Sequence, residues 1–423
     1  MSDTVSVEIP YGHATCHFRI PLENYGELLQ PNAVAVPTDG ARVIADAINK
    51  PIGALSLEQL ARGKREAVII ADDLTRPTPV SVVVPLLLDH LNAGGIYDDH
   101  IKIVIALGTH RPMTKAEILA RFGKQVVSRV RILNSEFSDK SKLMDCGVAA
   151  DGTRLWVDRQ VMASDLRIGV GTILPHPVAG WGGGAKIVYP GVGGAETVAH
   201  YHLQQTKLTR NFFGDISSPI RATMERWVGQ LGLHFIVNVV CTSAGEIYRA
   251  AAGHFIEAHR QGVEYARQVF AVRAQRRAEI VVVGSHPADL DFWQASKALL
   301  SADHLTQDGG TIILVTPCPE GIGPHAELAD YCGDDDPEGL AARAMAGKTA
   351  DPVAVAGGVT VAQMRRRTRF AIVSEGLAAE MCTRMKMKHY TSAQDAVEAA
   401  LKSYRRSARV SVITHGAEIF PLV

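Results

Sequence analysis

Short apolar segments rich in valine and isoleucine alternate along this chain with longer amphipathic segments. The apolar segments that we predict to be strands are residues 67–71, 101–107, 166–170, 235–241, 279–283, 311–315, 370–373 and 410–413. Nearly every position in them is apolar, and strands of this kind are covered on both faces. The pattern therefore predicts an α/β fold with mostly parallel sheets.

Helix signals lie between these strands. Residues 113–123 place Thr114 and Glu117 at the spacing of a capping box, and Gly123 is the expected end of that helix. Residues 253–267 form a second clear amphipathic pattern. Both segments fit the α/β prediction.

With 423 residues, the chain is long enough for two or three domains. The basic stretch 273–277 is the expected boundary. We predict an N-terminal α/β domain at residues 1–275, which carries a glycine-rich loop, and a C-terminal α/β domain at residues 279–405. The last strand can rejoin either domain, and we assign 409–423 to the first.

Composition excludes several classes of protein. Lys and Arg number 44, as do Asp and Glu, whereas a nucleic-acid-binding protein is expected to carry a basic excess. No apolar run approaches the roughly 20 residues of a membrane-spanning helix, and the N-terminus lacks the order of a signal peptide. The six cysteines include no C-x-x-C pair. We expect a soluble cytoplasmic protein with no nucleic-acid or membrane partner.

Polar side chains follow the first two predicted strands. Ligands of parallel α/β sheets bind just beyond the carboxyl ends of the strands. Asp73 and Arg76 follow the first strand, and Arg suits paired contacts with a carboxylate or phosphate, although the segment also fits an ordinary capping loop. His110 follows the second strand and can act as an acid or base, although a lone His is more often a structural hydrogen-bonding group.

The third strand leads into the segment 174–202, which has seven glycines between Gly180 and Gly194. Such a loop lets the backbone approach a phosphate or a flat cofactor closely. Residues 180–185 formally fit a dinucleotide-binding fingerprint, but Pro190 would stop the helix that this motif requires.

Lys186 and two histidines are the reactive groups of this segment. Lys186 could contact a phosphate or form a covalent link, and the alternative is a solvated lysine on a surface loop. His200 and His202 lie in a predicted helix two residues apart, so they point about 200° apart. At most one of them can face a given site, which leaves room for a single metal ligand.

A similar group follows the strand at 279–283. Trp293, Gln294 and Lys297 fall within about one helical turn. An aromatic ring, an amide and an ammonium group could close over a small anion from across an interdomain cleft. The alternative is a helix with a core tryptophan and a solvated lysine.

These motifs together resemble the nickel-dependent lactate racemase family. The resemblance runs from about residue 67 to 300 and extends to the last strand, whereas the first 60 residues and the stretch 330–400 add little. The motifs that carry it are Asp73-x-Thr-Arg76, Gly108-Thr-His110, His176-x3-Gly180, Gly-Gly-x-Lys186, Pro190-Gly191, Glu196-Thr197, Gln294-x2-Lys297 and Thr414-His-Gly416.

The resemblance implies a two-domain α/β protein with its active site in the interdomain cleft. It also implies nickel held by a nickel pincer nucleotide, pyridinium-3,5-bisthiocarboxylic acid mononucleotide, which is covalently linked through Lys186. His202 would be the protein ligand of the nickel, with His200 as the alternative. The cofactor-binding residues that the resemblance implies are Lys186, Asp73, Gly182, Gly183 and Gly184.

The implied activity is that of an isomerase, a racemase or epimerase that inverts C2 of a 2-hydroxy acid. Lactate is the first candidate, and malate or another larger acid is a further one. His110 and His176 would act as acid and base on opposite faces while hydride passes reversibly to the cofactor. The implied substrate-binding residues are Arg76, Gln294, Lys297 and Trp293, and the implied partners are a small 2-hydroxy acid and the cofactor-synthesis enzymes.

Two other functions remain open at this point. An NAD-dependent 2-hydroxy acid dehydrogenase or epimerase would need a complete glycine-rich strand–turn–helix, against which Pro190 argues. A non-catalytic nickel-cofactor-binding protein would bind nickel without turnover, but the presence of both His110 and His176 favours an enzyme. Trp181 and Trp293 flank the expected site and could shape its pocket.

Overall fold

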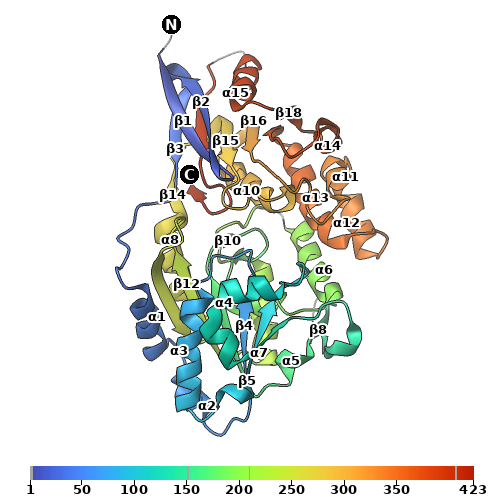
Figure 1. Cartoon of the computed structure of the whole chain (residues 1–423). Coiled ribbons are helices and arrows are strands. Elements are labelled where there is room, and N and C mark those ends of the chain that lie inside the picture. Colours follow the sequence, from blue (N-terminus) through green and yellow to red (C-terminus); the bar gives the residue numbers. More distant parts are fainter. Residues whose placement is uncertain (1–2, 150–151, 209, 405–406) are drawn as a thin grey trace.

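Two mostly parallel, six-stranded sheets organise the chain (Figure 1). The computed structural model describes residues 3–149, 152–208, 210–404 and 407–423. The first sheet has the order β13 (Ile247–Gly253), β12 (Phe235–Cys241), β9 (Leu166–Thr172), β4 (Ala67–Asp72), β5 (Ile101–Ala106) and β6 (Arg131–Asn134). In it only β13 pairs with its neighbour in the antiparallel sense.

All strand pairs of the second sheet are parallel. Its order is β18 (Lys388–Tyr390), β17 (Arg369–Val373), β16 (Thr306–Val315), β15 (Ala278–Gly284), β19 (Val410–Ile413) and β3 (Tyr25–Leu29). Each of the eight predicted strands is present in one of the two sheets. The predicted fold class is therefore confirmed.

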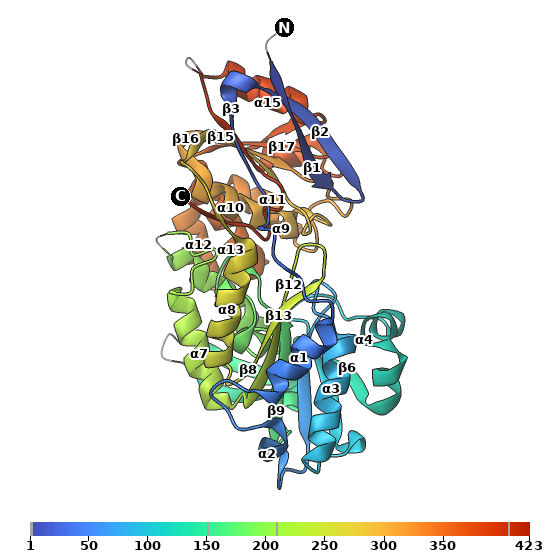
Figure 2. The ribbon, with the colours of Figure 1, turned by 90° about the vertical axis from the view of Figure 1, so that its left-hand side faces the viewer.

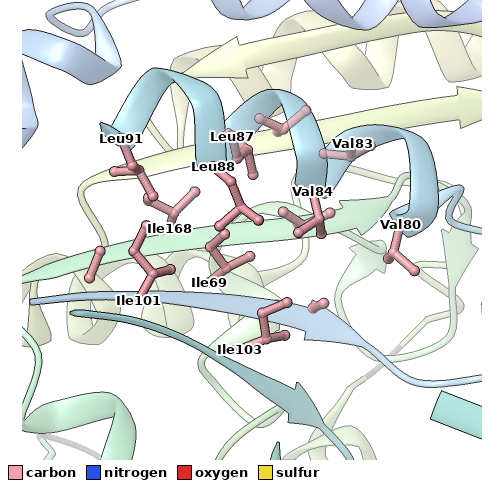
Figure 3. Close-up of a cluster of buried hydrophobic side chains, with 14 of the residues drawn as sticks. Ile69, Val80, Val83, Val84, Leu87, Leu88, Leu91, Ile101, Ile103 and Ile168 are labelled. Carbon is pink, nitrogen blue, oxygen red and sulfur yellow. The ribbon is translucent and has the colours of Figure 1, made fainter. Parts of the chain in front are cut away.

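Alternation along the strands explains why they are apolar throughout. Ile69 in β4 points to α3 (Val80–Ala93), whose residues Val84 and Leu88 pack on that face of the sheet (Figure 3). Its neighbours Val68 and Ile70 belong instead to the cluster beneath α7 (Pro219–Leu231) on the opposite face. The strand is covered on both sides, as its composition predicts.

The remaining elements of the first domain surround this sheet. They are α1 (Gly40–Asn49), α2 (Leu57–Ala61), α4 (Lys115–Arg129), α5 (Arg159–Met162), α6 (Ala195–Leu203), α8 (Glu257–Phe270) and the hairpins β7 (Leu143–Val148) with β8 (Arg154–Asp158) and β10 (Pro175–His176) with β11 (Gly180–Trp181). The capping box of Thr114 and Glu117 is confirmed. Gly123 has a φ of 79° and interrupts α4, but the helix resumes after it. The helix predicted from 253 begins later because Gly253 still belongs to β13.

Helices cover both faces of the second sheet as well. They are α9 (Phe292–Ala295), α10 (Lys297–Leu305), α11 (Leu328–Gly333), α12 (Pro337–Met345), α13 (Pro352–Arg365), α14 (Ala379–Arg384) and α15 (Ala393–Lys402). The hairpin of β1 (Thr4–Tyr11) and β2 (Ala14–Pro21) packs with α15 on one face, as Figure 2 shows. No helix in the described part of the chain is long and apolar enough to cross a membrane.

The expected domain limits need correction at both ends of the chain. We assigned 409–423 to the first domain, but β19 lies inside the second sheet between β15 and β3, while β20 (Phe420–Leu422) pairs with β14 (Ala271–Arg273). The first strands, expected in the N-terminal domain, also pack on the second sheet. A short apolar strand carries no local signal for the sheet that it joins. Residue 405, the expected end of the second domain, lies outside the described residues.

Candidate active site

The strand order of the first sheet reverses beside β4. From β4 the chain proceeds outward through β5 and β6, and then crosses back to place β9 and β12 on the other side. The loops after β4 and β9 leave the sheet in opposite directions, and ligands of open α/β sheets bind in the crevice between such loops. Asp73 and Arg76 follow β4, and His176 and Lys186 follow β9.

Asp73 and His110 form a hydrogen-bonded pair at this crevice. Their Oδ2 and Nδ1 atoms lie 2.7 Å apart, and the Asp73 side chain is only 5% exposed. Burial raises the pKa of Asp73, but the hydrogen bond and charge of His110 and the charge of Arg76 outweigh it and hold that pKa well below its usual range. An ionised carboxylate only accepts, so His110 donates from Nδ1, which leaves Nε2 as the acceptor in the neutral form of the ring.

The neighbouring Asp72 anchors this loop, a role that the sequence analysis missed. Asp72 accepts hydrogen bonds from Thr78 Oγ1 at 2.5 Å and from the Thr172 backbone N–H at 3.3 Å. Arg121 from α4 donates to its other carboxylate oxygen at 2.8 Å. The loop after β4 is therefore tied both to β9 and to a covering helix.

His176 is buried, and its Nδ1 accepts hydrogen bonds, whereas the Nδ1 of His110 donates one. The Nδ1 of His176 accepts from the backbone N–H groups of Val178 and Ala179 at 3.2 and 3.3 Å. Burial, followed by the charges of Lys186 and Arg76, lowers the pKa of His176 well below its usual value. A neutral ring that accepts at Nδ1 carries its proton on Nε2.

The glycines before Lys186 allow close contact between the loop and its surroundings. Gly183 and Gly184 have φ values of 72° and 61°. A Cβ atom at Gly183 would lie 2.8 Å from Asn238 Oδ1, and one at Gly184 would lie 2.9 Å from the His259 ring. The amides of Gly182 and Gly184 donate to Leu174 O and Asn238 Oδ1, so they are used within the protein.

A buried polar network from α7 and α8 holds the same loop. Arg221 donates to the carbonyl oxygens of Ala179, at 2.9 Å, and Trp181. His259 Nε2 donates to Gly182 O at 2.8 Å. Glu225 pairs with Arg221 and receives two hydrogen bonds of 2.7 Å from Arg260. These residues lie inside regular helices, where the sequence offered no motif to reveal them.

Trp181, which we expected to shape the pocket, is a core residue. It is fully buried, donates from Nε1 to Gly214 O at 2.8 Å and packs edge-on against Phe420. The expectation was wrong because adjacency in sequence to site residues does not decide which face of a loop a side chain occupies. Trp181 stabilises the loop from behind.

The side-chain amine of Lys186 has a lowered pKa. Burial lowers its pKa to about 7, assisted by the charges of Arg76 and Arg221 and opposed by Asp73 and Asp72. A substantial fraction of this amine is therefore uncharged at neutral pH. An uncharged amine is the form that can act as a nucleophile.

His202, near the end of α6, lines a cavity of about 70 Å³ together with His176. Burial lowers its pKa to about 3, with a further contribution from Lys186, so the imidazole is neutral and able to bind a metal. His200 is not among the residues that line this cavity. Both domains contribute to the lining, which consists of His176, Pro177, Val178, His202, Gln205, Trp293, Ser296, Lys297, Leu300, Gly357, Thr360, Val361 and Met364.

The second domain brings Trp293, Gln294 and Lys297 to the same place. Lys297 Nζ donates to Gln294 Oε1, and Trp293 packs edge-on against His202 with ring centres 6.2 Å apart. Burial lowers the pKa of Lys297, and the charges of Arg76 and Lys186 lower it further. These shared effects mean that cationic groups from both domains face one site.

Helix α13 completes the cavity and was absent from our expectations. Gly357, Thr360, Val361 and Met364 all come from it. Its small and apolar residues carry no chemical motif, and we had read the stretch 330–400 as adding little. Within the described ranges, no group of three or more His, Cys, Asp or Glu side chains could hold a metal ion.

Comparisons with known proteins agree with these features. Residues 11–213 match the lactate racemase N-terminal domain, and residues 273–420 match the lactate racemase C-terminal domain. A lactate racemase of Thermoanaerobacterium thermosaccharolyticum is 30% identical over 341 residues, which cover 79% of each chain. A lactate racemase of Lactiplantibacillus plantarum is 28% identical over 418 residues, which cover 97% of this chain and 98% of the relative.

Solved structures show the same similarity. The lactate racemase apoprotein from T. thermosaccharolyticum superimposes with a TM-score of 0.89 at 26% identity, covering 99% of this chain and all of that one. A Thermotoga maritima protein has a TM-score of 0.68 at 17% identity over 92% of this chain and 99% of its own, which shows the fold alone. The chain is thus an isomerase of the racemase type. It belongs to the lactate racemase family.

Proposed function

We propose that the protein racemises a small 2-hydroxy acid, with lactate as the first candidate, using a nickel pincer nucleotide. The observation that carries the proposal is that two histidines have complementary hydrogen bonds at Nδ1. His110 donates from Nδ1 to Asp73, so its neutral form accepts at Nε2, whereas His176 accepts at Nδ1, so its neutral form carries a proton on Nε2. One is ready to accept the substrate's hydroxyl proton and the other to return one, as inversion of C2 requires.

Cationic side chains from both domains would hold the substrate. Arg76 and Lys297 bind its carboxylate, and Gln294, which accepts from Lys297 Nζ, fixes the direction of that ammonium group. Trp293 covers the substrate beside His202. Holding the carboxylate from two sides keeps a planar 2-oxo acid in place until it is reduced again.

The residues present fit the cofactor that the family resemblance implies. With no three-residue metal site among the described side chains, nickel needs donors from outside the protein, and neutral His202 adds one. The partly uncharged amine of Lys186 suits a covalent link; Gly182, Gly183 and Gly184 precede it in the loop, and the charge of Asp73 acts on it. When bound, the cofactor supplies the acceptor for the hydride from C2.

The cavity favours lactate over malate. Lys297 is the one lysine or arginine that lines this cavity, and the proposal uses it together with Arg76 for the first carboxylate, so a second carboxylate would find no cation of its own there. The dehydrogenase alternative loses support because α6 begins only at Ala195, after the turn at Pro190. The non-catalytic alternative is left to experiment.

The test is to co-produce the protein with the cofactor-synthesis enzymes and to measure nickel content, intact mass and racemisation of L-lactate. We expect about one nickel per chain, an added mass that is lost in Lys186→Ala, and formation of D-lactate. Nickel and adduct without turnover of any 2-hydroxy acid would favour a carrier protein. Absence of both, beside an active family control, would refute the proposal.

A further inference from the structure

We propose that Trp293 and Gly357 together set the size of the substituent that the substrate may carry on C2. The site favours a small apolar group over larger or charged groups. This inference rests on the proposed function and deepens it.

The cavity beside His176 and His202 is small and has a mainly aliphatic boundary. Its volume is about 70 Å³. We call Val178, Leu300, Val361 and Met364 the apolar wall, since these four side chains form its aliphatic lining. Because Lys297, His176 and His202 lie in the same lining, we expect a 2-hydroxy acid bound by its carboxylate to present its C2 substituent to this wall.

The hydroxyl and amide donors of the lining are already engaged. Thr360 Oγ1 donates to Ala356 O at 2.9 Å, and Gln205 Nε2 donates to Thr360 Oγ1 at 3.0 Å. Ser296 Oγ donates to Trp293 O at 2.8 Å. A charged or polar substituent would therefore lose its water without gaining these donors, which disfavours its binding.

The indole of Trp293 is held on several sides. Its ring centre lies 6.2 Å from that of His202 and 4.5 Å from that of His325, whose Nδ1 pairs with Asp351 Oδ2 at 2.6 Å. On the side of α13 it approaches Gly357 so closely that a Cβ atom there would lie 2.8 Å from Trp293 Cζ3. Glycine is unfavourable inside a helix, and close approach of the indole accounts for it at this position.

This arrangement links one backbone position to the size of the cavity. A methyl group at residue 357 would push the indole away from α13 and reduce the free volume beside His202. A smaller ring at residue 293 would leave free space next to the apolar wall. The two substitutions should therefore change substrate preference in opposite directions.

The experiment compares lactate with 2-hydroxybutanoate, which is longer by one methylene group, on the cofactor-loaded protein. We expect Trp293→Phe to raise the ratio of kcat/KM for 2-hydroxybutanoate over lactate about tenfold, and Gly357→Ala to lower it about tenfold. Gly229→Ala is the matched control, because Gly229 also lies inside a helix and a Cβ there would meet only Phe255 Cζ, at 3.7 Å. The control substitution should leave this ratio of kcat/KM values within about twofold of the wild-type value.

A second readout avoids dependence on turnover. Titration of the loaded protein with lactate should quench tryptophan fluorescence, and Trp293→Phe should remove most of that change. If Gly357→Ala fails to fold, Trp293→Phe still tests the proposal. Equal selectivity in all active variants would overturn the inference, whereas an unchanged protein that racemises neither acid would overturn the proposed function instead.

Discussion

In the first domain, buried hydrogen bonds and ion pairs hold the site residues in place. The second domain contributes mainly aromatic and aliphatic side chains to the same site. Asp73 fixes His110, and the network of Arg221 and Glu225 fixes the loop before Lys186. Opposite them, Trp293 is held by ring contacts and the close approach of Gly357. The difference suits the proposed division of roles, in which buried hydrogen bonds would position the acid–base groups and the apolar lining from the second domain would select the substrate.

The strongest test of this comparison removes the proposed acid–base histidines of the first domain. His110→Ala and His176→Ala should each reduce kcat/KM for lactate about a thousandfold, because a positioned proton donor or acceptor is lost. Chiral chromatography of the products measures the effect. Substantial racemisation in both variants would show that other groups move the proton.

Removing a carboxylate from the buried network should lower the free energy of unfolding more than removing one from an exposed ion pair. Glu225→Ala leaves Arg221, whose side chain is only 1% exposed, without its carboxylate, and we expect a loss of about 3 kcal/mol in the free energy of unfolding. Urea denaturation measures it. Glu338→Ala, which removes the exposed pair with Arg366 in the second domain, should change the free energy of unfolding far less. Equal losses would remove the contrast between the domains.

Asp73→Asn tests positioning without changing the shape of the side chain. The amide cannot stabilise the orientation of His110 as an ionised carboxylate does, so kcat should fall about a hundredfold with a smaller change in KM. The low pKa of Asp73 further implies that its carboxylate stays ionised throughout the neutral range in the wild-type protein. A change in KM alone, with kcat retained, would assign Asp73 to substrate binding.

The smallest effect concerns the pH dependence of Lys186 in protein prepared without cofactor. Because its pKa is lowered to about 7, the reactive amine forms as pH rises through 7, whereas an ordinary lysine deprotonates near 10.4. Limited acetylation at pH 8 followed by peptide mass spectrometry should label Lys186 about tenfold faster than an exposed lysine such as Lys50. Labelling that rises only above pH 9 would contradict the lowered pKa.

The parts of the fold that were predicted correctly depend on local patterns. All eight strands were found because a strand covered on both faces is apolar at every position, as in β4. The placement of β19 was wrong because strand pairing is a long-range property. His110, His176 and Lys186 were found because chemistry-bearing side chains follow strands, but their roles remain proposals.

Other parts of the site left no local trace. Arg221, Asn238 and His259 act from inside helices and a strand, where a polar residue looks like any other. Gly357 could not be singled out because its importance depends on Trp293, which is 64 positions away in the chain. Such contacts become visible only when the two domains are folded against each other.

The pairing of β3 with β19 has a consequence for the order of folding during synthesis. The second sheet joins a strand made within the first 30 residues to one completed after residue 410, so the ribosome must deliver almost the whole chain before that sheet can close. The sheet of the first domain is complete once residue 253 has emerged. Domains generally fold as units during translation, so the first domain, which carries His110 and His176, should form first, before β1 to β3 can pair with the rest of the second sheet.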